Sequence, residues 1–176
     1  MNVQLAAWGT LLRANLMSWN EYVEALHALY LENPDSDILY QLELSTANSK
    51  DTLAILDRSA AKLTESEKRD YARTILFPLE TLYRSNMPLA DFNAIARRVY
   101  NAIPAELSGE EPFGALTTAD DYLDIDVNFE KTYDDRARDL FEYAFACCNP
   151  DCLPFIRPPK PKREHFLRRL FKRRIT

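Results

Sequence analysis

Apolar residues in the first hundred or so positions recur at intervals of three and four, the spacing that places side chains on one face of an α-helix. The first such stripe consists of Leu5, Trp8, Leu12 and Leu16. A capping box follows at Ser18 to Glu21, where the serine hydroxyl and the glutamate carboxylate can each bind a free backbone N–H at the start of a helix. The helix that begins there is expected to end at Pro34, because proline disrupts a helix interior.

The same pattern continues to Ile103. A second capping box, Thr64 to Glu67, opens a longer helix in which Pro78 predicts a kink or a break. Pro88 begins the next helix, which Pro104 ends. Two shorter helices between the boxes have the expected caps Asp35 or Ser36 and Ser49. The sequence therefore predicts an all-α protein, an antiparallel helical array of about six to eight helices.

Residues 104–128 interrupt this pattern with two glycines, two prolines and a run of acids, which predicts an irregular acidic loop region, either a long loop or a region of short elements. Apolar and polar side chains alternate over residues 123–129, a spacing that also fits a short strand. Helix is expected again from about Glu130 to Cys148. The predicted organisation is a single helical domain at 1–148, a proline-rich linker at 149–162 and a basic amphipathic tail helix at 163–176.

The net charge of −5 hides an uneven distribution. Residues 104–135 hold ten Asp or Glu and one Lys, a charge of −9, whereas residues 157–176 hold nine Lys or Arg and one Glu, a charge of +8. Because the two blocks nearly neutralise each other, the tail is expected either to dock on the acidic segment of its own chain or of a neighbouring copy, or to remain free and bind an external anion.

Several classes of function lack their sequence signals. The three glycines, Gly9, Gly109 and Gly114, have the wrong spacing for a Walker-type phosphate loop or a dinucleotide-binding fingerprint. The two histidines lie far apart, and His27 falls at the boundary of its apolar stripe, as a partly exposed structural histidine would. No targeting segment or membrane span is expected. Three cysteines, an odd number, are simplest to explain in a reducing cytoplasm.

Two patterns suggest metal ligands but depart from known sites. Residues 124–135 match much of the ligand spacing of a calcium loop, yet Phe129 occupies the position that requires glycine. Cys147, Cys148 and Cys152 lack a fourth ligand at zinc-site spacing, and we expect Cys147 to pack as a small apolar residue. A redox pair of Cys148 and Cys152 is the alternative. No metal, cofactor or catalytic residue is predicted.

Two parts of the chain resemble known families. Residues 22–36 are similar to the second half of a tetratricopeptide unit, although no second copy follows at the period of that repeat. Helix-packing positions at Leu16–Val23, Leu42–Leu56 and Leu79–Tyr83 carry another resemblance, which covers roughly the first hundred residues. It is to small, uncharacterised, all-helical bacterial proteins of the toxin-immunity type. Such a family implies a non-enzymatic binding protein.

These features predict a non-catalytic protein-binding module, of immunity or adaptor type, that recognises a basic partner. The expected partner-binding acids are Asp120, Asp121, Asp124, Asp126, Glu130, Asp134 and Asp135. The alternative is a protein that binds nucleic acid or an anionic membrane surface through its tail. The basic tail residues are Lys160, Lys162, Arg163, Arg168, Arg169, Lys172, Arg173 and Arg174.

Overall fold

The computed structural model describes residues 1–109, 111–124 and 132–148. Within these ranges the chain forms nine helices and no strand, so the all-α prediction is confirmed. The helices are α1 (Asn2–Arg13), α2 (Trp19–Glu32), α3 (Asp37–Ser45), α4 (Ser49–Ala60), α5 (Glu65–Arg84), α6 (Leu89–Ala102), α7 (Ala105–Ser108), α8 (Phe113–Asp124) and α9 (Thr132–Ala146).

Both predicted capping boxes are present. The Ser18 hydroxyl accepts from the Glu21 backbone N–H at 3.2 Å, and the Glu21 carboxylate accepts from the Ser18 N–H at 2.6 Å. Thr64 and Glu67 repeat this arrangement at the start of α5. The backbone hydrogen bond of each box holds the pKa of Glu21 and of Glu67 below the ordinary value. These two helix starts are therefore encoded locally.

The caps of the shorter helices differ in part from the prediction. Helix α4 begins at Ser49, but its cap is Asn48, whose side chain accepts from the Lys50 N–H at 3.1 Å. Ser36 precedes α3 without a side-chain capping bond. The predicted cap was one residue late at α4 because asparagine and serine serve equally well at this position.

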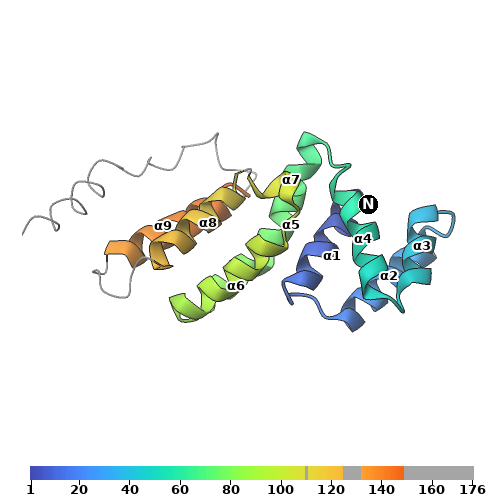
Figure 1. Cartoon of the computed structure of the whole chain (residues 1–176), viewed down its shortest axis with the longest axis horizontal. Helices are drawn as coiled ribbons and strands as arrows, with labels where there is room; N and C mark the ends of the chain where they lie inside the picture. The colour runs from blue at the N-terminus through green and yellow to red at the C-terminus, as the bar shows by residue number, and fades with distance from the viewer. Residues whose placement is uncertain (110, 125–131, 149–176) are drawn as a thin grey trace, which may run out of the picture.

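The helices pack around two apolar cores in an elongated arrangement (Figure 1). Helices α1 to α4 enclose one core, which includes the fully buried Tyr22 and Leu26. The larger core joins α1 and α4 to helices α5 to α9, with Tyr71 and Phe92 buried within it. Helix α1 contributes to both cores, with Leu5 facing the first and Ala6 the second. It therefore connects the two halves of the array.

Helix α5 runs through Pro78 without the break that the sequence suggested. Buried side chains lie on both sides of the proline, Ile75 and Leu76 before it and Leu79 after it. Their burial holds both parts of the helix against the same core. Apolar packing of this kind offsets the loss of one backbone hydrogen bond.

Of the two alternatives for residues 104–128, the described part of the segment forms short elements and not a long loop. It contains the one-turn helix α7 and the three-turn helix α8, in which Phe113, Leu116 and Ala119 are buried. Leu123 and Asp124, whose alternating pattern also fitted the start of a short strand, end α8 instead. The glycines and prolines suggested a loop, but the three- and four-residue spacing of the apolar side chains determined the structure once they had a core to enter. The rest of the candidate strand lies outside the described residues.

Helices α8 and α9 form a hairpin against α5 and α6 (Figure 1). Phe141 of α9 is fully buried and meets Phe92 of α6 edge to face, with 4.8 Å between ring centroids. Tyr83 and Phe145 complete this aromatic cluster. The cluster fixes the hairpin on the body and so positions the acidic residues at the end of α8 and the start of α9. Residues 149–176, the predicted linker and tail helix, lie outside the described ranges.

In the part of the chain that the structure describes, no helix has both the length and the apolar character needed to cross a membrane.

Candidate functional site

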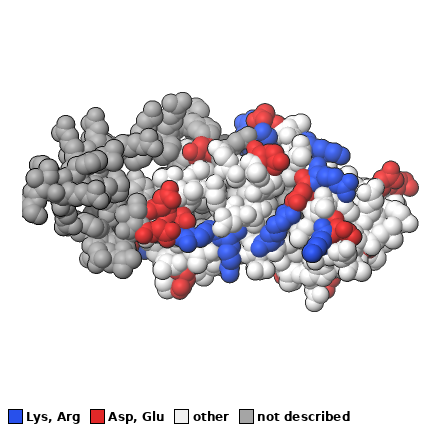
Figure 2. Space-filling view, in the orientation of Figure 1, with Lys and Arg blue, Asp and Glu red and all other residues white. Residues whose placement is uncertain are grey.

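The acidic residues of the α8–α9 hairpin outnumber its basic ones. Helices α8 and α9 hold seven Asp or Glu and two Arg. Acidic side chains gather where α8 approaches α6, beside basic side chains of the body (Figure 2). The hairpin therefore has an acidic character that the neighbouring body only partly neutralises.

Two arginines of the body supply that partial neutralisation: Arg84 of α5 pairs with Glu142 of α9, and Arg97 of α6 pairs with two aspartates of α8. The Nε of Arg97 donates to Asp120 Oδ1 at 2.9 Å, and its NH2 group donates to Asp124 Oδ1 at 2.5 Å. The two aspartates lie one turn apart on α8, so a single guanidinium reaches both. These hydrogen bonds, the one to Asp120 first, raise the pKa of Arg97 above its already high ordinary value. Arg97 is therefore permanently charged, and two of its three nitrogens donate to carboxylates.

Two of the predicted partner-binding acids thus have a structural role. The Asp120 side chain is only 20% exposed and accepts from both Arg97 and Asn93. Asp124 is 64% exposed, and only its Oδ1 is engaged by Arg97. Asp120 accordingly joins α8 to α6, whereas Asp124 still presents an oxygen to solvent.

The other predicted acids fall into two groups. Asp121, Asp134 and Asp135 are exposed and have no ion-pair partner among the described residues. Asp126 and Glu130 lie outside the described ranges. We call Asp121, Asp124, Asp134 and Asp135 the acidic surface.

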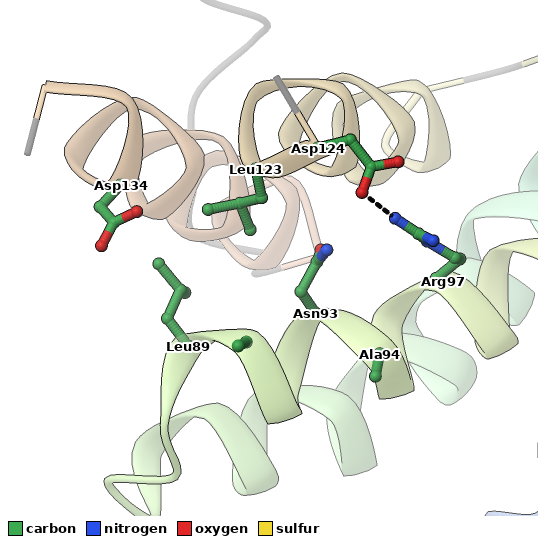
Figure 3. Close-up of a pocket in the computed structure, with 8 residues that line it drawn as sticks. Leu89, Asn93, Ala94, Arg97, Leu123, Asp124 and Asp134 are labelled. Carbon is green, nitrogen blue, oxygen red and sulfur yellow. Dashed lines mark hydrogen bonds and ion pairs between the residues drawn. The ribbon is translucent and has the colours of Figure 1, made fainter. Parts of the chain in front are cut away.

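A hollow of about 480 Å³ lies beside the acidic surface, between α6, the end of α8 and the start of α9 (Figure 3). Leu89 and Leu123 form apolar walls, while Asp134 and the Arg97–Asp124 pair stand on opposite sides. This volume lies within the range of about 300–1,000 Å³ that small-ligand sites occupy. The hollow is therefore large enough for a side chain or a small molecule.

Asn93 projects from α6 into this space (Figure 3). The residue is 7% exposed, and its Nδ2 donates to Asp120 Oδ1 at 2.7 Å. Its Oδ1 is buried and has no hydrogen-bond partner. Leaving a buried acceptor unsatisfied costs about 1–3 kcal/mol, so a donor is expected at this position.

Sequence reasoning missed Asn93 and Arg97. One signal was available: Asn93 lies four residues after Leu89 on the otherwise apolar stripe of its helix. A polar residue on a buried stripe indicates a specific partner. The pairing of Arg97 with Asp120, 23 residues apart, had no local signal.

The other candidate sites gain little support from the geometry. In the segment that resembles a calcium loop, Asp124 is hydrogen-bonded to Arg97, and residues 125–131 lie outside the described residues. Within the described ranges no group of three potential metal ligands converges.

Neither the two thiols that the structure describes nor His27 points to a reactive site. Cys147 and Cys148 are both half-buried, and burial raises the pKa of the Cys148 thiol to about 12, which disfavours a reactive thiolate. Cys152, the other half of the candidate redox pair, lies outside the described residues. His27 is 63% exposed and lies 3.3 Å from Glu43.

Comparison with known proteins gives no significant match to a protein-family model, a curated protein or a solved structure. We therefore infer function from the arrangement of the side chains themselves.

Proposed function

We propose that this protein is a non-catalytic binding module of immunity or adaptor type that recognises a basic protein partner through the acidic surface. The observation that carries the proposal is the set of exposed carboxylates of Asp121, Asp134 and Asp135, which no described cation neutralises. They lie on a hairpin that buried aromatic rings hold in place. A fixed array of uncompensated negative charge is suited to binding a positive surface.

Such a surface has two physical advantages: it raises the rate of association with a basic partner, and it discriminates between partners. Opposite potentials accelerate association, and like charges exclude unsuitable partners. A toxin that acts on nucleic acid presents a basic surface, so an acidic module could cover it. The resemblance of the first hundred or so residues to toxin-immunity proteins supports the same class of function, and the odd number of cysteines supports a cytoplasmic location.

The test is affinity capture from an extract of the native host, with bound proteins identified by mass spectrometry. The parent chain is compared with a triple variant, Asp121→Asn, Asp134→Asn and Asp135→Asn. A matched control, Glu24→Gln, Glu32→Gln and Asp35→Asn, removes the same charge from exposed positions on and just after α2. We expect a basic protein that the parent and the control retain and the triple variant loses. Equal capture by all three chains would refute the proposal.

The alternative function follows from the charge of +8 over residues 157–176. A tail of this charge could bind the phosphates of a nucleic acid or an anionic membrane. The same capture experiment with a chain that lacks residues 157–176 separates the two functions. A partner that depends on the tail, and is indifferent to the acidic surface, would favour the alternative.

A further inference from the structure

An unsatisfied hydrogen-bond acceptor lies at the hollow between α6, α8 and α9, and the neighbouring carboxylate shows which atom it is. Asp120 is a carboxylate that only accepts hydrogen bonds, so the nitrogen of the Asn93 amide must face it. The orientation of the amide is thereby determined, and Oδ1 is the atom left without a partner. A ligand that satisfies Asn93 must therefore bring a donor.

The charge around the hollow favours a positively charged donor. Asp134 stands at one side with no ion-pair partner among the residues described, and Asp124 offers its second oxygen at the other. Arg97 is the one cation among the lining residues that the structure describes, and two carboxylates already engage it. With Asp120 included, the three carboxylates and one guanidinium leave a net charge of −2.

The shape and the apolar walls of the hollow further restrict which kind of cation can bind. A small inorganic cation would gain nothing from Leu89 and Leu123, whereas the methylene stem of an arginine or lysine side chain packs well on such surfaces. The acceptors are spread over Asn93, Asp124 and Asp134. A guanidinium has five N–H donors in a planar fork and can serve several acceptors at once, which an ammonium does less well.

We propose that this hollow, the arginine pocket, receives an arginine side chain of the basic partner. The inference rests on the proposed function and specifies the contact that would make recognition selective. The guanidinium donates to Asn93 Oδ1 and to the carboxylates of Asp124 and Asp134, while its stem lies between Leu89 and Leu123.

The pocket can be tested without the partner. The full chain, labelled with ¹⁵N, is titrated with N-acetyl-arginine amide while amide shifts are followed by NMR. We expect saturable shifts with a dissociation constant in the millimolar range, confined to residues 89–97, 123–124 and 133–135. The uncharged isostere N-acetyl-citrulline amide should bind at least about fivefold more weakly, and N-acetyl-lysine amide should fall between them.

A matched pair of variants assigns the binding to the pocket. Asp134→Asn removes a carboxylate that lines it, and Asp135→Asn removes an equal charge from the next residue, which does not. Both residues lie in the first turn of α9, so their effects on the helix should be alike. We expect Asp134→Asn to weaken binding about three- to tenfold and Asp135→Asn less than twofold. A well-dispersed spectrum of each variant confirms that it is folded.

Two results would overturn the proposal. One is the absence of saturable shifts near Asn93, which would mean that water alone satisfies its oxygen. The other is an equal effect of the two variants, which would indicate diffuse attraction to the acidic surface. Failure of the pocket can be distinguished from failure of the proposed function. A basic protein can still be captured through Asp121 and Asp135 when arginine does not bind the pocket. Conversely, arginine binding with no basic protein captured would leave the pocket intact and refute the proposed function.

Discussion

The hydroxyls of Thr10 and Tyr71 lie 2.6 Å apart inside the larger core, where they join α1 to α5. Thr10 also donates to the Ala102 carbonyl oxygen at 3.4 Å, at the end of α6. Either hydroxyl can be the donor in the short contact; when Thr10 donates to Ala102, Tyr71 donates to Thr10. Burial raises the pKa of Tyr71 to about 12, so that proton is retained at any physiological pH.

Removing the hydroxyl of either Thr10 or Tyr71 should destabilise the fold. We expect Tyr71→Phe to lower the free energy of unfolding by about 1–2 kcal/mol and Thr10→Val, which leaves the tyrosine hydroxyl unsatisfied, by about 1–3 kcal/mol. The double variant should lose less than the sum, because the two changes remove one shared interaction. Urea denaturation of the four chains measures this coupling. Strict additivity would show that the hydroxyls act independently.

Leu26 is fully buried in the core formed by α1 to α4. Leu26→Ala should therefore lower the free energy of unfolding by about 2–5 kcal/mol through lost burial and a residual cavity. Leu31, on the same helix, is 67% exposed and provides the matched control. Leu31→Ala should change stability by no more than about 0.5 kcal/mol. Comparable losses from both variants in a denaturant titration would contradict the assignment of this core. Trp19, at the start of the same helix, is only half-buried and should be the more tolerant position.

The two capping boxes should make the protein acid-sensitive. Their hydrogen bonds hold the pKa of Glu21 and of Glu67 below the ordinary 4.5. Their stabilising contribution is therefore complete above pH 4.5 and is lost as the pH falls through the lowered values. Glutamine at both positions can still accept a hydrogen bond but does not titrate.

The double variant Glu21→Gln, Glu67→Gln should accordingly show a shallower loss of stability below pH 4.5 than the parent. Unfolding by urea between pH 3 and pH 7 measures the slope. Replacing Glu24 and Glu32 by glutamine removes two exposed carboxylates outside the boxes and should leave the slope unchanged. Parallel pH profiles for the parent and the capping-box variant would exclude this role.

Arg97 and Arg98 are adjacent, exposed residues of α6 with different surroundings. Arg97 bridges Asp120 and Asp124, whereas Arg98 has no ion-pair partner in the described part of the chain. Arg97→Gln should lower Tm more than Arg98→Gln, because only the former leaves the half-buried Asp120 without its cation. Thermal melts at low ionic strength compare the two. Equal melting temperatures would mean that the bridge contributes nothing to docking α8 on α6.

The opposite charges of residues 104–135 and 157–176 lead to a prediction about the tail. If the tail docks on the acidic segment, a limiting protease should remove it slowly at low ionic strength. Cleavage should accelerate as salt shortens the range of the attraction, which is about 10 Å at 0.1 M. A synthetic peptide of residues 149–176 controls for the effect of salt on the protease itself. Equal rates at every salt concentration, with no change in the Tm of the body after cleavage, would identify a free binding arm.

Local chemistry in the sequence determined most of the helices. Capping boxes at Ser18 and Thr64 and prolines at positions 34, 88 and 104 act within a few residues of themselves, so their effects can be predicted without a fold. The first apolar stripe identified Leu5 and Trp8 as core residues, because helical periodicity alone assigns their face. The uneven charge was likewise visible in the sequence.

The tertiary structure decided two things. It determined which secondary structure formed where local signals conflicted, and which residues distant in the sequence came into contact. Pro78 and the glycines around α8 favour irregular backbone, yet burial of Leu79 and Phe113 outweighed them, since apolar packing contributes more than a local preference. Only the docking of α8 on α6 brought Arg97 to Asp120 and left the Asn93 oxygen unsatisfied beside Asp134. The sequence determined that the hairpin is acidic. The packing of α8 and α9 against α6 determined which of its carboxylates are engaged within the fold and which face a partner, because that choice depends on distances between helices that no local pattern encodes.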